Sequence, residues 1–305
     1  MTILVTGATG FIGRALISRL AKDKVTGLAR SLKPCSKSVN WVQFDLENIL
    51  DSKEIPGKYE TVVHLAARAH ILNETSDDPL AEFLRFNRDV SIELARQMFY
   101  QGMKRFVFIS SIGVNGAKTE KGDVFNESST PRPETDYGKS KLEAELGLKA
   151  LSEELGFELV IIRPPLVYGE GAPGNFGKLM KLLQIGLPLP FGAVNNKKSY
   201  VSVTNLVDFI ATCCLHSDAK NQTFLVADDD VTSTKELLVN LSNNKVVLLP
   251  VPSGLLHTIL CLVGRKAMST QLLSDLVIDN THAKQVLGWQ PLESTKDALN
   301  SIKIN

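Results

Sequence analysis

The chain has 305 residues, enough for one large domain or two modest ones. Its 34 basic and 33 acidic residues leave a formal charge of +1, and 44% of its residues are hydrophobic, which excludes an intrinsically disordered protein and gives no electrostatic basis for binding nucleic acid. The four cysteines form no CxxC pair, and MTILVTGATG is no signal peptide. We expect a cytoplasmic protein without disulfides, a metal site or a membrane span, because its most apolar stretch has nine residues against the ~20 of a span.

Short apolar runs alternate with helical stretches over the first 165 residues. Continuous apolar strands separated by helices are typical of a parallel sheet covered on both faces. The fold class is therefore α/β, with a Rossmann-type doubly wound parallel sheet. The predicted helices span 11–21, 79–101 and 136–155. The predicted strands are Ile3–Thr6, Val25–Ala29, Trp41–Phe44, Thr61–Leu65, Arg105–Ser110 and Glu158–Arg163.

The pattern changes after Arg163, where glycine and proline cluster over 164–192 around one predicted helix at 176–185. A strand near 199–203 and a helix at 204–216 are expected to return to the sheet. The chain then divides into two domains. Residues 1–165 and about 199–225 form a dinucleotide-binding domain, and about 166–198 and 226–305 form a smaller, interleaved substrate domain.

Three glycines connect the first strand to the first helix. Gly7, Gly10 and Gly13 occur in ILVTGATGFIGRAL with GxxGxxG spacing. In such a loop the first glycine permits a tight turn, the second lets the backbone approach a pyrophosphate, and the third lets the helix pack against the strand. The amino terminus of the helix favours the anion. The loop predicts a dinucleotide site; the alternative is an ordinary turn.

The end of the second strand indicates which dinucleotide is bound. An acidic residue there would bind the ribose 2′-hydroxyl of NAD, but no Asp or Glu occurs from Val25 to Leu32. Arg30 takes that position, and Arg14 follows the last glycine of the loop. Two guanidinium groups favour a 2′-phosphate, so we expect NADP(H). NAD(H) is the alternative if both arginines are merely solvated.

Tyr137 and Lys141 lie four residues apart in DYGKSK and share one face of the helix 136–155. A phenol titrates near ~10, and a nearby ammonium stabilises the phenolate and lowers its pKa. The pair is then suited to move a proton to or from an alcohol oxygen while a hydride is transferred. Ser111, after the fifth strand, is placed to hydrogen-bond that oxygen. The alternatives are a surface Tyr–Lys pair and a turn-forming serine.

Six motifs follow one another along nearly the whole chain: TGATGFIG, VVHLAA, FISSIGVNG, YGKSK, RPPLVYGEG and LGWQP. Together they resemble the extended short-chain dehydrogenase/reductase family, in its NAD(P)-dependent nucleotide-sugar epimerase, dehydratase and reductase branch. The resemblance implies that Ser111, Tyr137 and Lys141 are catalytic. The cofactor-binding residues, from the loop and the resemblance together, are Gly7, Thr9, Gly10, Phe11, Ile12, Gly13, Arg14, Arg30, Asp45, Leu46, Leu65, Ala66, Ala67, Lys141 and Pro164.

The resemblance also implies a UDP-sugar substrate. The loop LPLPFG would hold the uracil, and Lys198 replaces a family arginine that binds phosphate. Asn87 would brace the helix 79–101, which is expected to pair with 136–155 in a homodimer; the alternative is an ordinary buried stripe. The substrate-binding residues so implied are Ser111, Tyr137, Asn175, Leu189, Phe191, Lys198 and Arg265.

Two reactions at C4 of a UDP-sugar fit these residues. We expect an NADPH-dependent 4-ketoreductase of a UDP-4-keto-6-deoxy-(N-acetyl)hexose for surface polysaccharide biosynthesis, because NADP suits a consumed reductant. The alternative is a UDP-sugar 4-epimerase with tightly bound NAD. A 4,6-dehydratase is disfavoured because Ile112 and Gly113 replace the acidic pair that follows its catalytic residue. A cofactor-binding regulatory protein would have lost the Tyr–Lys pair.

Two polar features are expected to have no chemical role. His64 ends a buried strand, and we interpret it as structural. Its spacing to His70 does not resemble a zinc site. The run Asp228–Asp230 is interpreted as a solvated turn.

Overall fold

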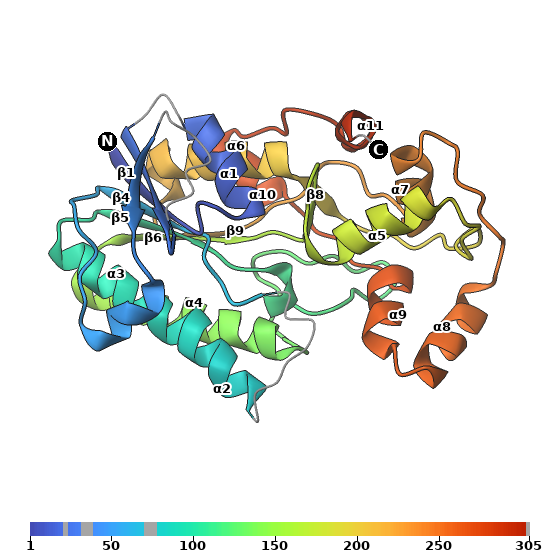
Figure 1. Cartoon of the computed structure of the whole chain (residues 1–305), viewed down its shortest axis with the longest axis horizontal. Helices are drawn as coiled ribbons and strands as arrows, with labels where there is room; N and C mark the ends of the chain where they lie inside the picture. The colour runs from blue at the N-terminus through green and yellow to red at the C-terminus, as the bar shows by residue number, and fades with distance from the viewer. Residues whose placement is uncertain (21–23, 32–38, 70–77, 303–305) are drawn as a thin grey trace.

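The computed structural model describes residues 1–20, 24–31, 39–69 and 78–302. Seven parallel strands form its central sheet in the order β3–β2–β1–β4–β5–β6–β9 (Figure 1). The order changes direction at β1, and sheets of this kind bind ligands beyond the carboxyl ends of the strands at such a point, here β1 and β4. The predicted doubly wound sheet is confirmed. The strands are β1 Thr2–Thr6, β2 Lys24–Ala29, β3 Asn40–Gln43, β4 Thr61–His64, β5 Arg105–Ile109, β6 Glu158–Arg163 and β9 Gln222–Leu225.

Helices cover both faces of the sheet because alternate strand residues point to opposite sides. In β1, Ile3 and Val5 enter the core beneath α1 and α6, whereas Leu4 enters the core beneath α3 and α4. Figure 1 shows these two helical layers above and below the sheet. The α-helices are α1 Phe11–Leu20, α2 Pro79–Leu84, α3 Val90–Tyr100, α4 Asp136–Leu155, α5 Gly174–Ile185, α6 Val203–Leu215, α7 Thr234–Leu241, α8 Ser253–Leu262, α9 Lys266–Leu273, α10 Thr281–Leu287 and α11 Thr295–Ser301.

The helix predicted at 79–101 is interrupted. A π-helical turn, Arg85–Asp89, separates α2 from α3, and the Val90 N–H bonds to the carbonyl of Arg85. Such a turn adds one residue to the helix and is frequent near functional sites. Here it turns Asn87 into the interior, where its side chain is fully buried. The homodimer expected through this region and α4 stays a prediction.

The strand expected near 199–203 does not join the central sheet. Instead β8 (Tyr200–Ser202) pairs in parallel with β7 (Leu166–Tyr168) in a separate two-stranded sheet, and β9 completes the central one. The helix that follows β8 does return, because α6 packs beside α1. Beyond β7 and β8 a third core unites α5, α7 and α11 around Tyr168 and Phe176.

The interpretation of Asp228 as part of a solvated turn is wrong. Asp229 and Asp230 are exposed, but the Asp228 carboxylate is buried. It accepts hydrogen bonds from Tyr168 Oη at 2.6 Å, from Asn205 Nδ2 at 2.7 Å, and from the backbone N–H of Ser202 at 3.1 Å. Burial raises the pKa of this carboxyl, while its donors oppose the rise. Three elements distant in sequence supply these donors, so the local sequence could not indicate them.

Candidate active site

The glycine loop forms a backbone cradle between β1 and α1. Gly7 has φ +64°, and a Cβ on it would lie 2.8 Å from the backbone nitrogen of Ala66. A Cβ on Gly13 would lie 2.2 Å from the carbonyl oxygen of Gly7. Gly10 is exposed at the mouth of the loop, and its N–H bonds back to Gly7 at 2.9 Å. Backbone amides, a helix amino terminus and no side-chain bulk suit the pyrophosphate of a dinucleotide.

Two of the predicted cofactor-binding residues are exposed arginines. Arg30 follows β2 and Arg14 lies in the first turn of α1, and both are exposed. The Arg14 guanidinium donates to the carbonyl of Thr9 at 3.3 Å. Asp45 lies beyond β3, where its carboxylate accepts the N–H of Glu47 at 3.3 Å. In the described residues, an arginine rather than a carboxylate therefore follows β2 directly.

The three predicted catalytic residues come from adjoining elements. Ser111 caps the short 3-10 turn Ile112–Val114 after β5, and its Oγ accepts the N–H of Gly113 at 3.1 Å. Tyr137 and Lys141 lie in the first two turns of α4. Thr135 caps the amino terminus of this helix. Gly138 lets α4 approach, because a Cβ there would lie 2.7 Å from the carbonyl oxygen of Gly113.

Lys141 is a nearly fully buried cation. Its Nζ donates to the carbonyl of Ile109 at 2.8 Å and lies 4.4 Å from the centre of the Phe108 ring. Burial lowers the pKa of this ammonium to about 7, and the charge of Glu145 opposes the shift. Lys141 therefore ties the catalytic helix to the carboxyl end of β5.

Tyr137 is half-buried beneath Phe83, whose ring meets it edge-on with centroids 6.3 Å apart. Burial raises the pKa of the phenol to about 12, so the expectation that Lys141 lowers it does not hold in this structure. The reason is that the Lys141 ammonium lies 6.0 Å from the Tyr137 ring centre and donates its hydrogen bond elsewhere. Burial thus favours the neutral form of the Tyr137 phenol.

Ser110 and Pro164 border the same site. The Ser110 hydroxyl is buried and, in the described part of the chain, has no hydrogen-bond partner. The carbonyl of Pro164 accepts the N–H of Ile112 at 2.9 Å, which joins the loop after β6 to the turn that holds Ser111. A buried hydroxyl without a partner at the carboxyl edge of a parallel sheet indicates a place where a bound group completes the hydrogen bonding.

A buried ion pair missed in the sequence fixes the other end of this region. Arg163, the last residue of β6, donates from Nε to Glu145 of α4 at 2.9 Å and from Nη1 to Asn115 at 3.0 Å. Both charged side chains are almost completely buried. One sequence signal was present: Glu145 lies one helical turn after Lys141, on the face that meets the sheet.

Hydrogen bonds connect the glycine loop to α4 through the interior. His64 contacts Thr6 Oγ1 at 2.7 Å through Nδ1 and Ser91 Oγ at 2.9 Å through Nε2. Ser91 donates to the carbonyl of Asn87 at 2.7 Å, and Asn87 donates to Ser140 at 2.9 Å. Ser140 in turn donates to the carbonyl of Tyr137 at 2.8 Å. Asn87 thus connects the π-helical turn to α4, and its expected bracing of the helix 79–101 and the active-site strand stays a prediction. His64 has the buried, bonded setting of a structural residue.

We expect the stability of the protein to fall below pH 6.5 because of His64. Burial, and then the charge of Lys141, lower its pKa to about 3 from 6.5. Between these two pKa values the unfolded chain binds a proton at His64 and the folded chain does not. The contribution of His64 to the free energy of unfolding is therefore complete above pH 6.5 and is lost as the pH falls towards 3. Urea denaturation should give about 1.4 kcal/mol less stability at pH 5.5 than at pH 7.5.

His64→Gln removes the titrating ring and serves as the comparison. Its loss of stability between these two pH values should be smaller by that amount, although its stability at pH 7.5 is lower. An equal pH dependence in both proteins would contradict the assignment.

The predicted substrate residues lie beyond the sheet. Leu189 and Phe191 are buried in the third core, and Leu189 bonds with the segment around Leu248. Lys198 is buried, and burial lowers the pKa of its ammonium to about 8 against the opposing charge of Asp275. Asn175 belongs to α5, and Arg265 is exposed between α8 and α9. Their roles stay predictions.

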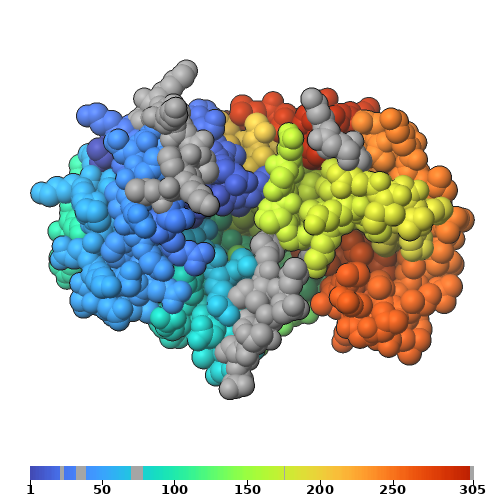
Figure 2. All heavy atoms as spheres, in the orientation of Figure 1, coloured from blue at the N-terminus to red at the C-terminus, as the bar shows by residue number. Residues whose placement is uncertain are grey.

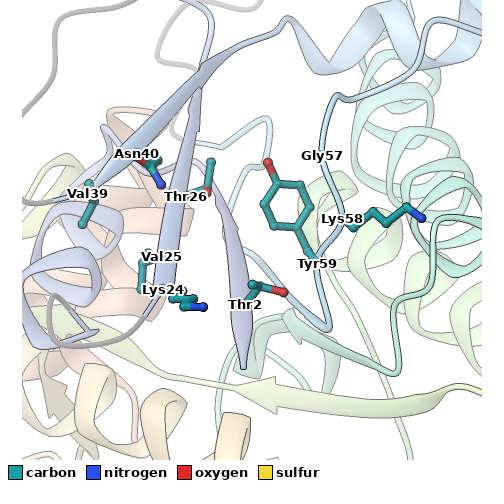
Figure 3. Close-up of a pocket in the computed structure, with 9 residues that line it drawn as sticks. All are labelled: Thr2, Lys24, Val25, Thr26, Val39, Asn40, Gly57, Lys58 and Tyr59. Atoms are coloured by element: carbon teal, nitrogen blue, oxygen red, sulfur yellow. The ribbon is translucent and has the colours of Figure 1, made fainter.

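A separate hollow of about 550 Å³ lies at the opposite edge of the sheet (Figure 3). It is bordered by Thr2, Lys24 and Asn40, the first residues of β1, β2 and β3, and by Tyr59. It therefore lies away from the glycine loop. Over the described residues, no helix has both the length and the apolar character needed to cross a bilayer, and no three His, Cys, Asp or Glu side chains gather as a metal site. His70 lies outside these residues.

Comparison with known families decides the class of the protein. The model of the NAD dependent epimerase/dehydratase family matches residues 3–227, which include the glycine loop, Ser111, Tyr137 and Lys141. The chain belongs to this family. It is therefore an enzyme that depends on a nicotinamide cofactor and acts on nucleotide sugars, in agreement with the resemblance seen in the sequence.

Individual members of the epimerase/dehydratase family are similar over the whole chain. A UDP-glucose 4-epimerase of Vibrio cholerae is 39% identical over 303 residues, covering 97% of this chain and 92% of that protein. A dTDP-4-dehydro-6-deoxyglucose reductase of Escherichia coli is 24% identical, covering 98% and 96%. The crystal structure of UDP-glucose 4-epimerase with UDP-glucose from Thermotoga maritima shares the fold, with a TM-score of 0.77, 23% identity, and coverage of 98% and 96%.

Proposed function

We propose that the protein is a UDP-sugar 4-epimerase with a tightly bound nicotinamide dinucleotide. What carries the proposal is that α4, which holds Tyr137 and Lys141, meets the turn that follows Ser111 at Gly138, while Lys141 bonds to the carboxyl end of β5, in the same sheet whose first strand leads into the glycine cradle. The 39% identity to a UDP-glucose 4-epimerase supports the epimerase, the alternative in the sequence analysis, better than the 4-ketoreductase expected there.

The proposed chemistry begins with the hydroxyl at C4 of the sugar. A dinucleotide held by Gly7, Gly10 and Gly13 would supply hydride chemistry at this carbon, namely removal of a hydride and its return to the other face, and in its oxidised form would add positive charge to the site. Tyr137 takes the hydroxyl proton and later returns it to the keto oxygen, which Ser111 orients by a hydrogen bond. Lys141 holds α4 against β5 and would bond the nicotinamide ribose. The positive charge that the oxidised cofactor would bring to the site would favour the phenolate that the first proton transfer requires.

The cofactor would lie across the carboxyl ends of β1 and β4. Gly7, Gly10 and Gly13 would hold its pyrophosphate. The other cofactor-binding residues predicted from the sequence would surround its two nucleosides. The substrate would bind on the side of the molecule that contains the third core. There Lys198 would offer a point charge to its phosphates, and Phe191 would offer a surface for its uracil. The division into a dinucleotide-binding and a substrate domain is part of this proposal.

A 4-ketoreductase is the second candidate, and one observation favours it. Arg30 is exposed just after β2, where the described residues hold no carboxylate for the ribose of NAD, and Arg14 is exposed in the first turn of α1. These guanidinium groups suit the 2′-phosphate of NADP, which a reductase consumes.

Identifying the cofactor tests the two candidates against each other. The purified protein is denatured, and the released nucleotide is separated by chromatography, while turnover is followed with UDP-glucose and with a UDP-4-keto-6-deoxy sugar plus NADPH. Released NAD with interconversion of UDP-glucose and UDP-galactose is expected. No retained nucleotide, with NADPH-dependent reduction of the keto sugar, would replace the epimerase by the reductase.

A further inference from the structure

A helical hairpin at one end of the molecule exposes an unusual amount of apolar surface. It consists of α8 and α9, far from α3 and the outer strands of the sheet (Figure 1). Leu255, Ile259 and Leu262 follow one another at helical spacing along α8, and all three are exposed, Leu262 by 82%. The only fully buried side chain of α8 is that of Leu256, which attaches the helix to the third core. An amphipathic helix of a globular domain normally turns its apolar stripe inward, not outward.

The apolar surface continues beyond the hairpin. The N–H of Leu189 bonds to Val247 at 2.9 Å, and the N–H of Leu249 bonds back to Leu189 at 2.8 Å. Val247 and Leu249 are exposed on either side of this pairing, as is Leu187 at the end of the α5 region. Figure 2 shows the α5 region in yellow and the hairpin in orange at the same end of the molecule. We call this surface, made by 185–187, 247–249 and 255–263, the apolar end face.

The apolar end face belongs to segments with charge of only one sign. Residues 174–192 contain Lys178 and Lys181, and residues 242–274 contain Lys245, Arg265 and Lys266. Neither segment contains an aspartate or glutamate, although acidic residues account for 33 of the 305. All five of these cations are exposed. Exposed leucine and isoleucine flanked by lysine and arginine are the composition of a surface that binds at the boundary of an anionic bilayer.

The hairpin is rigid enough to present this surface. His257 of α8 contacts Ser269 of α9 at 2.8 Å, and the N–H of Arg265 bonds to the carbonyl of Leu260 at 2.7 Å. Ser269 is fully buried between the two helices. The hairpin is therefore already folded before it binds a partner. The loss of conformational entropy on binding is correspondingly small.

We propose that the apolar end face docks the enzyme on an anionic phospholipid surface, with α8 lying in the interface and the flanking lysines on the headgroups. The charges argue against a second copy of the chain as the partner. In a symmetric pair this face would meet another face whose flanking charges are all positive, and the two would repel. The inference goes beyond the proposed function and concerns a surface separate from Ser111, Tyr137 and Lys141.

Vesicle sedimentation tests the proposal without measuring activity. The intact protein is mixed at low salt with vesicles of phosphatidylglycerol and phosphatidylcholine in equal parts, or of phosphatidylcholine alone. We expect binding to the anionic vesicles that weakens as salt is added. Ile259→Glu combined with Leu262→Glu should lower the partition coefficient at least tenfold. Lys245→Glu combined with Lys266→Glu should lower it about fivefold or more for each lysine.

Leu215→Glu is the matched control, since Leu215 is an exposed leucine at the end of α6. This variant should bind like the unmodified protein. The proposal is overturned if the unmodified protein does not sediment with anionic vesicles, if it binds neutral vesicles equally, or if Leu215→Glu weakens binding as much as the α8 variant. It is also overturned if light scattering without lipid shows that the unmodified chain self-associates through this face and the α8 variant does not.

Discussion

Replacing Tyr137 with phenylalanine should lower kcat by about 10²- to 10⁴-fold, the usual contribution of a positioned proton donor or acceptor. The change removes only the hydroxyl, and the ring can keep its edge contact with Phe83. Cofactor binding should therefore persist, because no part of the glycine cradle is altered. Steady-state kinetics with the UDP-sugar gives the first quantity, and quantification of the bound dinucleotide gives the second.

Tyr100→Phe controls for the loss of a phenol in general. Tyr100 ends α3 and is 71% exposed, so its hydroxyl has no part in the site. This variant should keep full activity. If Tyr137→Phe also keeps full activity, Tyr137 does not transfer the proton; if Tyr137→Phe loses the cofactor instead, Tyr137 acts in binding.

Replacing Glu145 with alanine should lower the free energy of unfolding by about 3–5 kcal/mol. The change leaves the Arg163 guanidinium buried at the end of β6 with only Asn115 and its backbone surroundings to compensate it. An unpaired buried charge is far more costly than a missing surface ion pair. Urea denaturation followed by circular dichroism measures the loss. Because Glu145 and Lys141 are on one helix, activity should fall as α4 loosens.

Two comparisons separate the buried charge from other causes. Glu153→Ala removes an exposed carboxylate from the same helix and should change stability by no more than about 0.5 kcal/mol. The double variant Glu145→Leu with Arg163→Met removes both charges and should recover most of the stability lost by Glu145→Ala. A double variant as unstable as the single one would show that packing, rather than the unpaired charge, causes the loss.

The sheet was predictable because its strands are short, continuous apolar runs separated by helical stretches. Runs such as Phe106–Ile109 are apolar throughout, as is typical of strands buried on both faces. The pairing of β7 with β8 was not predictable, since three-residue strands have no periodicity of their own. Asp228 was misinterpreted because its donors, Tyr168 and Asn205, come from other parts of the chain.

Ser111, Tyr137 and Lys141 could be singled out because they occur in compact motifs with fixed spacing, and their catalytic roles stay predictions. The electrostatics of these residues could not be predicted in the same way. Their spacing in the sequence suggested that Lys141 lowers the pKa of Tyr137. In the structure, burial raises the pKa of the Tyr137 phenol and lowers the pKa of the Lys141 ammonium. The Glu145–Arg163 pair escaped notice because an ion pair between a helix and a strand requires a known register between them.

The π-helical turn Arg85–Asp89 constrains how the chain length can vary. An extra residue advances an α-helix by about 100° about its axis and ~1.5 Å along it. The turn therefore sets the rotational phase of α2 relative to α3, and with it the side of α2 on which Phe83 meets Tyr137. A surface loop absorbs an inserted or deleted residue without effect elsewhere. Between 79 and 100 the same event rotates one wall of the active site away from the phenol, so the residue count of this segment is as much a part of the catalytic geometry as the residues themselves.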